Sequence, residues 1–386
     1  MLGYRKRSFG HAHALLRTLR ANLEDLEVLR ELQNLLLREV MRAEEKIRHL
    51  KSEVRKITEA EGTATVKRVE YLNNRIKGAR QCAYVWRCFG DAIAFLYLDR
   101  FSLKQCLYST ETPHPKQDAG FILGKDGLTN ELALLESALE YGVPAILVDL
   151  TNTIRHGDVC LLGGPDPYLI EVKSGKNVNS RGKKQKRSLK KLRTLYETDE
   201  CNDLRGIPKL QRRSNKTPEK THIDVINECI REAMEVGHAT RHPEHGLYYL
   251  ALTDDGPNLE EVLGTLGLKD AVWPFFLNKY KADRTWAPYF PFILSIDNVD
   301  HLWNFIRGSL FILVFVELDA LCKIAFDEGC NATVDSDNWE YPLRIEKPDG
   351  RTINISSHML TRIGLEFVSP QWIVRTSLER LGVEEY

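Results

Sequence analysis

Hydrophobic residues recur at alternating spacings of four and three in the first part of this 386-residue chain. The repeat predicts one long helix over residues 14–60 that carries a coiled-coil seam. The members of the seam are Leu36, Val40, Ala43, Ile47, Leu50, Val54 and Ile57. A second helical pattern covers residues 66–97. Since a seam is buried against another helix, the pattern fits either a helical hairpin within one chain or a coiled coil between two chains.

Shorter apolar runs replace this pattern from about residue 109 onward. A Leu/Ala stripe between Asn130 and Gly142 predicts a helix, and the run VPAILVDL at residues 143–150 predicts a buried strand. A Gly-Pro-rich turn at residues 163–167 then separates two more runs, which predict a strand on each side of it. The expected order is therefore helix, strand, strand, turn and strand.

Later segments extend this core and add a further region. After a basic helix, an amphipathic helix at residues 221–236 and a buried strand at residues 247–252 are placed to complete an α-β-β-β-α-β order. The predicted regions are 1–108 (helical coiled coil or hairpin), 109–255 (α/β core with a basic insertion at 174–220) and 256–386 (α/β region of unknown role).

Charged residues gather where the two central strands meet. Asp158 follows a glycine at the start of one strand, and Glu171 and Lys173 close the other. Period-2 alternation puts Glu171 and Lys173 on the same face of their strand. Because burying two carboxylates and an ammonium is costly, their convergence needs a reason, and a divalent cation held by hard oxygen ligands is one such reason.

The run Gly157-Asp158 followed by Glu171-Val172-Lys173, after a helix with Glu131, resembles the PD-(D/E)XK nuclease superfamily over roughly residues 120–255. The resemblance implies a restriction-endonuclease-like mixed sheet flanked by helices. It implies a Mg²⁺ ion that is held by Asp158, Glu171 and the backbone carbonyl of Val172. Mn²⁺ can substitute for Mg²⁺. Lys173 would position the attacking water, and Glu131 would complete the site. Glu136 on the same helix is the alternative to Glu131.

The implied activity is Mg²⁺-dependent hydrolysis of phosphodiester bonds in DNA by an endonuclease. Many such nucleases act in defence against foreign DNA, so a defence effector is the expected context. A single core of this kind cuts one strand, and double-strand cleavage usually needs two sites. A homodimer formed through the helical regions is therefore expected.

The distribution of charge supports a nucleic-acid partner although the chain contains 54 basic and 54 acidic residues. Residues 174–196 carry nine Lys or Arg and no acid, and phosphate binding needs such local clustering. The residues expected to contact nucleic acid are Lys176, Arg181, Lys183, Lys184, Gln185, Lys186 and Arg187. The alternative function is a non-catalytic coiled-coil scaffold that binds nucleic acid or a partner protein through this segment.

The eight cysteines are scattered and form no CxxC pair, which is typical of reduced thiols. The N-terminus has no apolar signal core, and no apolar run is long enough to cross a bilayer. A cytoplasmic location without membrane contact is expected.

Overall fold

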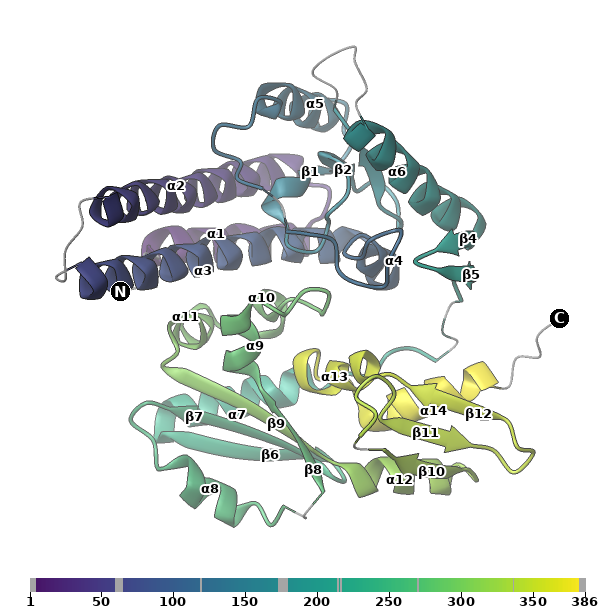
Figure 1. Cartoon of the computed structure of the whole chain (residues 1–386). Coiled ribbons are helices and arrows are strands. Elements are labelled where there is room, and N and C mark those ends of the chain that lie inside the picture. The colour runs from purple at the N-terminus through teal and green to yellow at the C-terminus, as the bar shows by residue number, and fades with distance from the viewer. Residues whose placement is uncertain are drawn as a thin grey trace. The chain divides into compact units, whose positions relative to one another are not determined.

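The computed structural model describes residues 5–59, 65–118, 120–172, 180–213, 215, 217–268, 271–335 and 337–381 (Figure 1). The chain is α/β, as expected, with helices and small antiparallel sheets. It divides into two compact units, Met1–Arg213 and Ser214–Tyr386.

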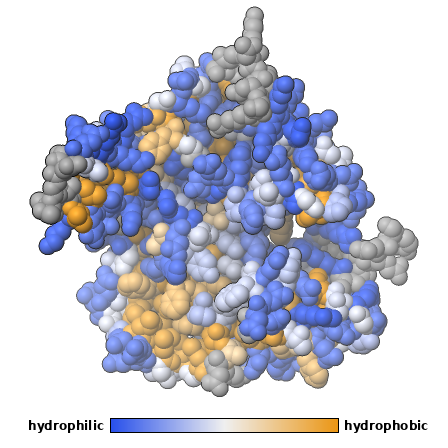
Figure 2. All heavy atoms as spheres, viewed as in Figure 1, coloured by the Kyte–Doolittle hydropathy of each residue, from blue (hydrophilic) through white to orange (hydrophobic). Residues whose placement is uncertain are grey.

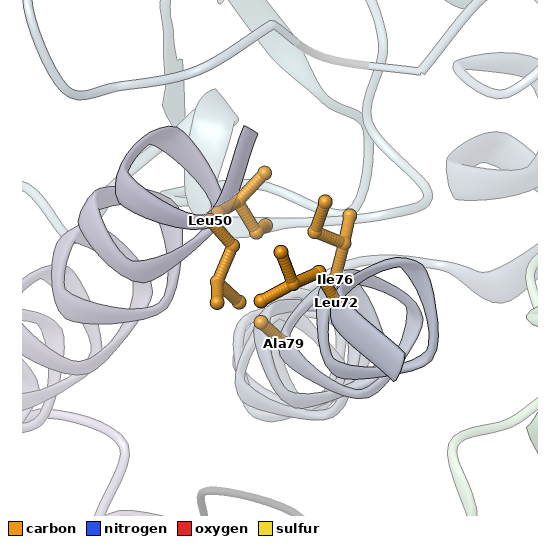
Figure 3. Packing of buried hydrophobic residues seen from close by; sticks show 5 residues of the cluster. Leu50, Leu72, Ile76 and Ala79 are labelled. Atoms are coloured by element: carbon orange, nitrogen blue, oxygen red, sulfur yellow. The ribbon is translucent and has the colours of Figure 1, made fainter. Parts of the chain in front are cut away.

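Two long helices, α2 (Leu26–Glu59) and α3 (Thr65–Tyr97), pack against each other within the first unit. Figure 3 shows Leu50 of α2 facing Leu72, Ile76 and Ala79 of α3, and all four are buried. The seam is therefore satisfied inside one chain, so the hairpin alternative is confirmed.

The expected single helix over residues 14–60 is wrong, because the structure has α1 (Lys6–Ala21) and α2 with a break between them. The break follows from local side-chain hydrogen bonds. The Asn22 side chain accepts from the Glu24 N–H at 3.2 Å, and Asp25 accepts from the Val28 N–H at 3.1 Å. Asn and Asp in these roles end one helix and begin the next.

The first unit continues with the elements that carry the expected acidic residues. A three-stranded antiparallel sheet has the order β1-β2-β3, and a hairpin of β4 and β5 follows it. The elements are α4 (Arg100–Gln105), α5 (Leu128–Glu140), β1 (Ala145–Leu147), the 3₁₀ turn η1 (Val148–Leu150), β2 (Val159–Leu161), β3 (Tyr168–Ile170), α6 (Ser180–Thr198), β4 (Glu200–Leu204) and β5 (Ile207–Gln211). The expected order of helix, three strands and basic helix is confirmed at this level.

Residues 1–108 do not form a separate region, because α2 holds the edge of the small sheet. The buried Gln33 side chain donates to the Ala145 carbonyl at 2.9 Å and accepts from the Leu147 N–H at 3.1 Å. These bonds take the place of a neighbouring strand beside β1, so backbone groups that would otherwise be buried and unpaired are satisfied. The helical hairpin and the sheet are one unit.

The second unit has its own sheet in the order β6-β7-β9-β8 and a smaller one in the order β10-β11-β12, both antiparallel. Its strands are β6 (His238–Glu244), β7 (Leu247–Thr253), β8 (Val272–Phe276), β9 (Leu310–Glu317), β10 (Asn331–Val334), β11 (Leu343–Glu346) and β12 (Thr352–Ile355). Its helices are α7 (Ile223–Val236), α8 (Leu259–Thr265), α9 (Leu277–Asp283), α10 (Phe292–Ser295), α11 (Val299–Arg307), α12 (Leu318–Asp327), α13 (Ser357–Leu365) and α14 (Pro370–Leu381).

The expected boundary at residue 255 differs from the structure. Strand β7, expected to complete the first core, pairs with β6 along one edge and with β9 along the other. Both of its edges are therefore used, and it cannot add a parallel strand to β1–β3. The mixed sheet expected for the core is accordingly absent among the described residues, where all strand pairs are antiparallel.

The expected insertion at residues 174–220 includes ordered structure. Helix α6 packs on the β4–β5 hairpin through Leu195, Cys201 and Leu204, which are buried together. Across the described part of the chain, no helix combines the length and apolar character needed to cross a membrane.

Candidate functional site

Asp158 is placed by a tight approach between two strands. Gly157, at φ +80°, lies so close to β3 that a Cβ there would be 2.9 Å from the Ile170 carbonyl oxygen. The Asp158 N–H donates to that carbonyl at 2.7 Å, and the Asp158 carboxylate accepts from the Val172 N–H at 2.9 Å. A glycine is needed at 157 because this φ and this contact exclude a side chain.

Of the two glutamates on α5, Glu131 reaches the same place as Asp158 and Glu136 does not. Glu131 is only 2 % exposed, whereas Glu136 lies near the surface and accepts from Arg30 Nε at 2.8 Å. The buried face of α5 holds Glu131 together with Leu135 and Leu139. The structure therefore brings Glu131, and not Glu136, next to Asp158.

A lysine occupies the centre of the acidic residues. Lys125 Nζ lies 2.9 Å from Glu131 Oε2, 2.8 Å from Asp149 Oδ2 and 3.2 Å from Asp158 Oδ1. We call Lys125, Glu131, Asp149 and Asp158 the lysine-centred cluster. Its carboxylates come from α5, η1 and the position just before β2, and its ammonium comes from the loop before α5.

The ionisation of the cluster reflects competition between burial and charge pairing. Burial alone would lower the pKa of Lys125, but its hydrogen bonds with Asp149 and Glu131 outweigh burial and raise that pKa above its ordinary value. Burial raises the pKa of Glu131, against the opposing hydrogen bond from Lys125. The ammonium is therefore held in its charged form by the carboxylates around it.

Glu171 is expected inside a strand, but it lies just beyond the end of β3. Its Oε2 accepts from Gln185 Nε2 at 3.2 Å, so the first turns of α6 reach the site. Burial, followed by the charge of Asp158, raises the pKa of Glu171 to about 7. Glu171 is thus electrostatically coupled to the lysine-centred cluster while hydrogen-bonded to α6.

Several expected residues cannot be placed. Lys173 and Lys176 lie outside the described residues, and the side chain of Arg181 does as well. Val172 is described, and its N–H contacts Asp158.

The remaining expected nucleic-acid residues lie on α6. Lys183, Lys184, Lys186 and Arg187 are exposed, while Gln185 between them is half-buried against Glu171. Lys184 pairs with Glu111 at 2.7 Å. One end of α6 thus combines a polar contact to the site with cations directed to solvent.

Donor chemistry and geometry give different answers about a metal ion. Carboxylate oxygens are the ligands that Mg²⁺ prefers, and four carboxylates with one central ammonium leave excess negative charge. Yet among the residues that the structure describes, no group of three or more His, Cys, Asp or Glu is placed to hold a metal ion. The cation at the centre of this arrangement is the Lys125 ammonium.

Lys125 and Asp149 were not expected from the sequence. Asp149 is the one acid in the apolar run of residues 143–150, and an acid in such a run is a signal that could have identified it. Lys125 has no comparable signal, because it lies in a loop and meets its partners only through the fold. Arg87 of α3 donates to the Asp149 carbonyl at 2.9 Å and holds η1 in place.

Comparisons with family models, curated proteins and solved structures give no match to this chain.

Proposed function

We propose that the chain is a metal-dependent endonuclease that hydrolyses phosphodiester bonds of DNA, with a PD-(D/E)XK-like set of acidic residues on a small antiparallel sheet. The observation that carries the proposal is the convergence of Glu131, Asp158 and Glu171 beside a basic helix. These are the acidic residues that the PD-(D/E)XK resemblance singles out, and they come from α5, the position just before β2 and the position just after β3. A role in defence against foreign DNA is the expected context.

The donor chemistry suits a hard divalent cation, with Asp158, Glu171 and the Val172 carbonyl as the groups that would hold Mg²⁺. Such an ion supplies charge stabilisation and a more acidic water at the scissile phosphate. The pKa of about 7 for Glu171 indicates that this carboxylate carries its charge at a cost, which an added cation would remove.

Residues of the chain would position the acidic side chains and bind the substrate. Gln185 donates to Glu171 and fixes the position of its carboxylate relative to α6. Lys125 holds Asp149 and Asp158 near Glu131 despite their like charges. Lys173, outside the described residues, keeps the water-positioning role that the resemblance implies. The exposed cations of α6 begin next to this site, where phosphate groups of a substrate would pass.

A plasmid cleavage assay tests the proposal. We expect Mg²⁺-dependent nicking or linearisation by the wild-type chain and none in EDTA. Asp158→Asn and Glu171→Gln should each lower the cleavage rate by at least about 100-fold, because each removes a charged ligand. Wild-type rates in both variants would contradict the proposal.

Glu136→Gln is the matched control. It removes a carboxylate of the same helix that contacts Arg30 and not the cluster. Its cleavage rate should stay within about twofold of the wild type, whereas Glu131→Gln should lose activity.

A non-catalytic scaffold is the second candidate, and one observation favours it. Lys125 already contacts three carboxylates and offsets part of their charge, so a cation occupies the centre of the cluster without a metal ion. Nucleic-acid binding without cleavage at any divalent-cation concentration would support this reading.

The seam is not available for a contact between two chains, because Leu50 and its neighbours are buried within one chain. A homodimer would use another surface, and light scattering at micromolar concentration tests for it.

A further inference from the structure

A groove runs between α2 and α3 toward the turn of the hairpin. It has a volume of about 830 Å³, and Val54, Val66, Val69 and Ile76 contribute apolar side chains to it. Figure 2 shows hydrophobic surface bordered by hydrophilic residues at this end of the hairpin. Next to the buried cluster of the seam, Val54 and Ile57 are only partly covered.

The rim of the groove is cationic. Lys51 comes from α2, and Lys77 and Arg80 come from α3, while Glu70 is the one acid among the lining residues. Within the described ranges, none of these three cations pairs with a carboxylate. Lys51 instead lies over the Phe121 ring at 5.8 Å from its centroid. Three such cations around one groove suit a partner that carries repeated negative charge.

Helices α2 and α3 form the groove and also hold the loops of the candidate active site. The Lys125 loop is held on α2, because Arg48 donates to the Leu123 carbonyl and Glu44 accepts from the Leu123 N–H, each at 2.9 Å. On α3, Arg87 holds the Asp149 carbonyl. Arg80 precedes Arg87 by seven residues, so both project from the same side of α3.

Distances along the helices place the groove within a few nucleotide steps of the residues that hold the site. Arg80 lies seven residues from Arg87, and Lys51 lies seven residues from Glu44, which is about 10 Å in each case at about 1.5 Å per residue. Val66, at the far end of the groove, is about 30 Å from Arg87 by the same measure. At about 3.4 Å per nucleotide step, the groove would begin about three steps from the site and end about nine steps from it.

We propose that the α2–α3 groove binds the phosphate backbone of the nucleic acid on one side of the candidate active site. This inference rests on the proposed function, and it adds a second contact surface to α6. Lys51, Lys77 and Arg80 would contact phosphates, and the apolar floor would lie beneath the sugars.

Salt-dependent binding of a labelled DNA duplex of about 30 base pairs, measured in EDTA, tests the inference. The slope of log K against log salt falls by about 0.9 for every phosphate group that the protein no longer neutralises. The triple variant Lys51→Gln, Lys77→Gln and Arg80→Gln should therefore reduce the slope by up to about 2.7. Glutamine keeps helix propensity, so the unfolding temperature should stay near that of the wild type.

The matched control removes three exposed cations elsewhere, by Arg7→Gln, Arg17→Gln and Arg307→Gln. It makes the same change in net charge, and its slope should fall by less than about 0.9. Equal reductions in both triple variants, or no reduction in the groove variant, would overturn the inference. The second result is also expected if the groove instead receives an acidic helix of a protein.

Failure of the inference and failure of the proposed function are distinguishable. A wild-type chain that binds no DNA at any salt concentration contradicts the proposed function and the inference with it. A wild-type chain that binds DNA with a slope unaffected by the groove variant contradicts the inference alone.

Discussion

Replacing Lys125 by methionine tests whether one ammonium holds the acidic site together. The substitution keeps the length of the side chain and removes the charge between Glu131, Asp149 and Asp158. Those carboxylates are 2 %, 14 % and 13 % exposed, so they would repel one another with little screening by water. Removing one partner of a fully buried ion pair costs about 3–5 kcal/mol.

The expected decrease in stability for Lys125→Met is smaller, about 2–4 kcal/mol, because the lysine side chain itself is 29 % exposed. For a unit of this size, each kcal/mol lowers the unfolding temperature by about 2–4 °C, so we expect a decrease of about 4–16 °C. The assay is thermal unfolding followed by circular dichroism in EDTA at pH 8. Lys125→Arg, which retains the positive charge, should be destabilised less.

Lys279→Met is the control for this measurement, since Lys279 pairs with one exposed carboxylate, Asp283, at 2.6 Å. Its unfolding temperature should stay near that of the wild type, because exposed ion pairs contribute little to stability. If Lys125→Met and Lys279→Met unfold at the same temperature, Lys125 does not hold the cluster and the reasoning is refuted. Adding Mg²⁺ should restore part of the stability of Lys125→Met, because a second cation can then neutralise the carboxylates.

Three further predictions concern pH, packing and binding. The folded-state pKa of Glu171 is raised from 4.5 to about 7, so the folded chain holds a proton that the unfolded chain releases, and stability falls as pH rises between these values. Glu171→Gln should remove this pH dependence and stabilise the chain above pH 7, by about 3 kcal/mol at most. Urea unfolding of both proteins at pH 5 and pH 8 measures the free energy of unfolding. The same change in that free energy between the two pH values in both proteins would contradict the prediction. Leu50→Asp should destabilise the first unit by about 3–5 kcal/mol in denaturant unfolding without changing the molecular mass, because Leu50 is 2 % exposed inside a single chain; a shift from dimer to folded monomer would contradict the intramolecular hairpin. Four exposed cations of α6 can be replaced together by serine: Lys183, Lys184, Lys186 and Arg187. The slope of log K against log salt for DNA binding should then fall by up to about 3.6. An unchanged slope would show that these side chains do not contact phosphate.

Local patterns predicted the elements well and their assembly less well. Leu135 and Leu139 mark the buried face of α5, and the apolar run before Asp149 marks β1, because each depends on residues close in sequence. The break between α1 and α2 was also encoded locally, in Asn22 and Asp25, but the continuous leucine repeat obscured it. Such caps need only one side-chain contact, which hydrophobic periodicity does not register.

Long-range pairing accounts for the larger differences. Strand β7 was assigned to the first core because its composition fits a buried strand in any sheet. Its partner β9 begins 57 residues beyond the end of β7, and nothing in the local pattern selects that pairing. Lys125 was missed for the same reason, since Asp149 and Asp158 lie 24 and 33 residues away from it.

The helical hairpin is a structural part of the candidate site and not an appended coiled coil. Gln33 pairs with β1, Glu44 holds the loop that leads to Lys125, and Arg87 holds the turn that carries Asp149. Each of these side chains projects from α2 or α3 toward the small sheet, which has only three residues per strand and little core of its own. A sheet this short depends on packing against other elements for stability. The buried seam between α2 and α3 therefore stabilises the positions of the acidic residues as well as the hairpin, and a substitution in the seam should disturb the site from a distance.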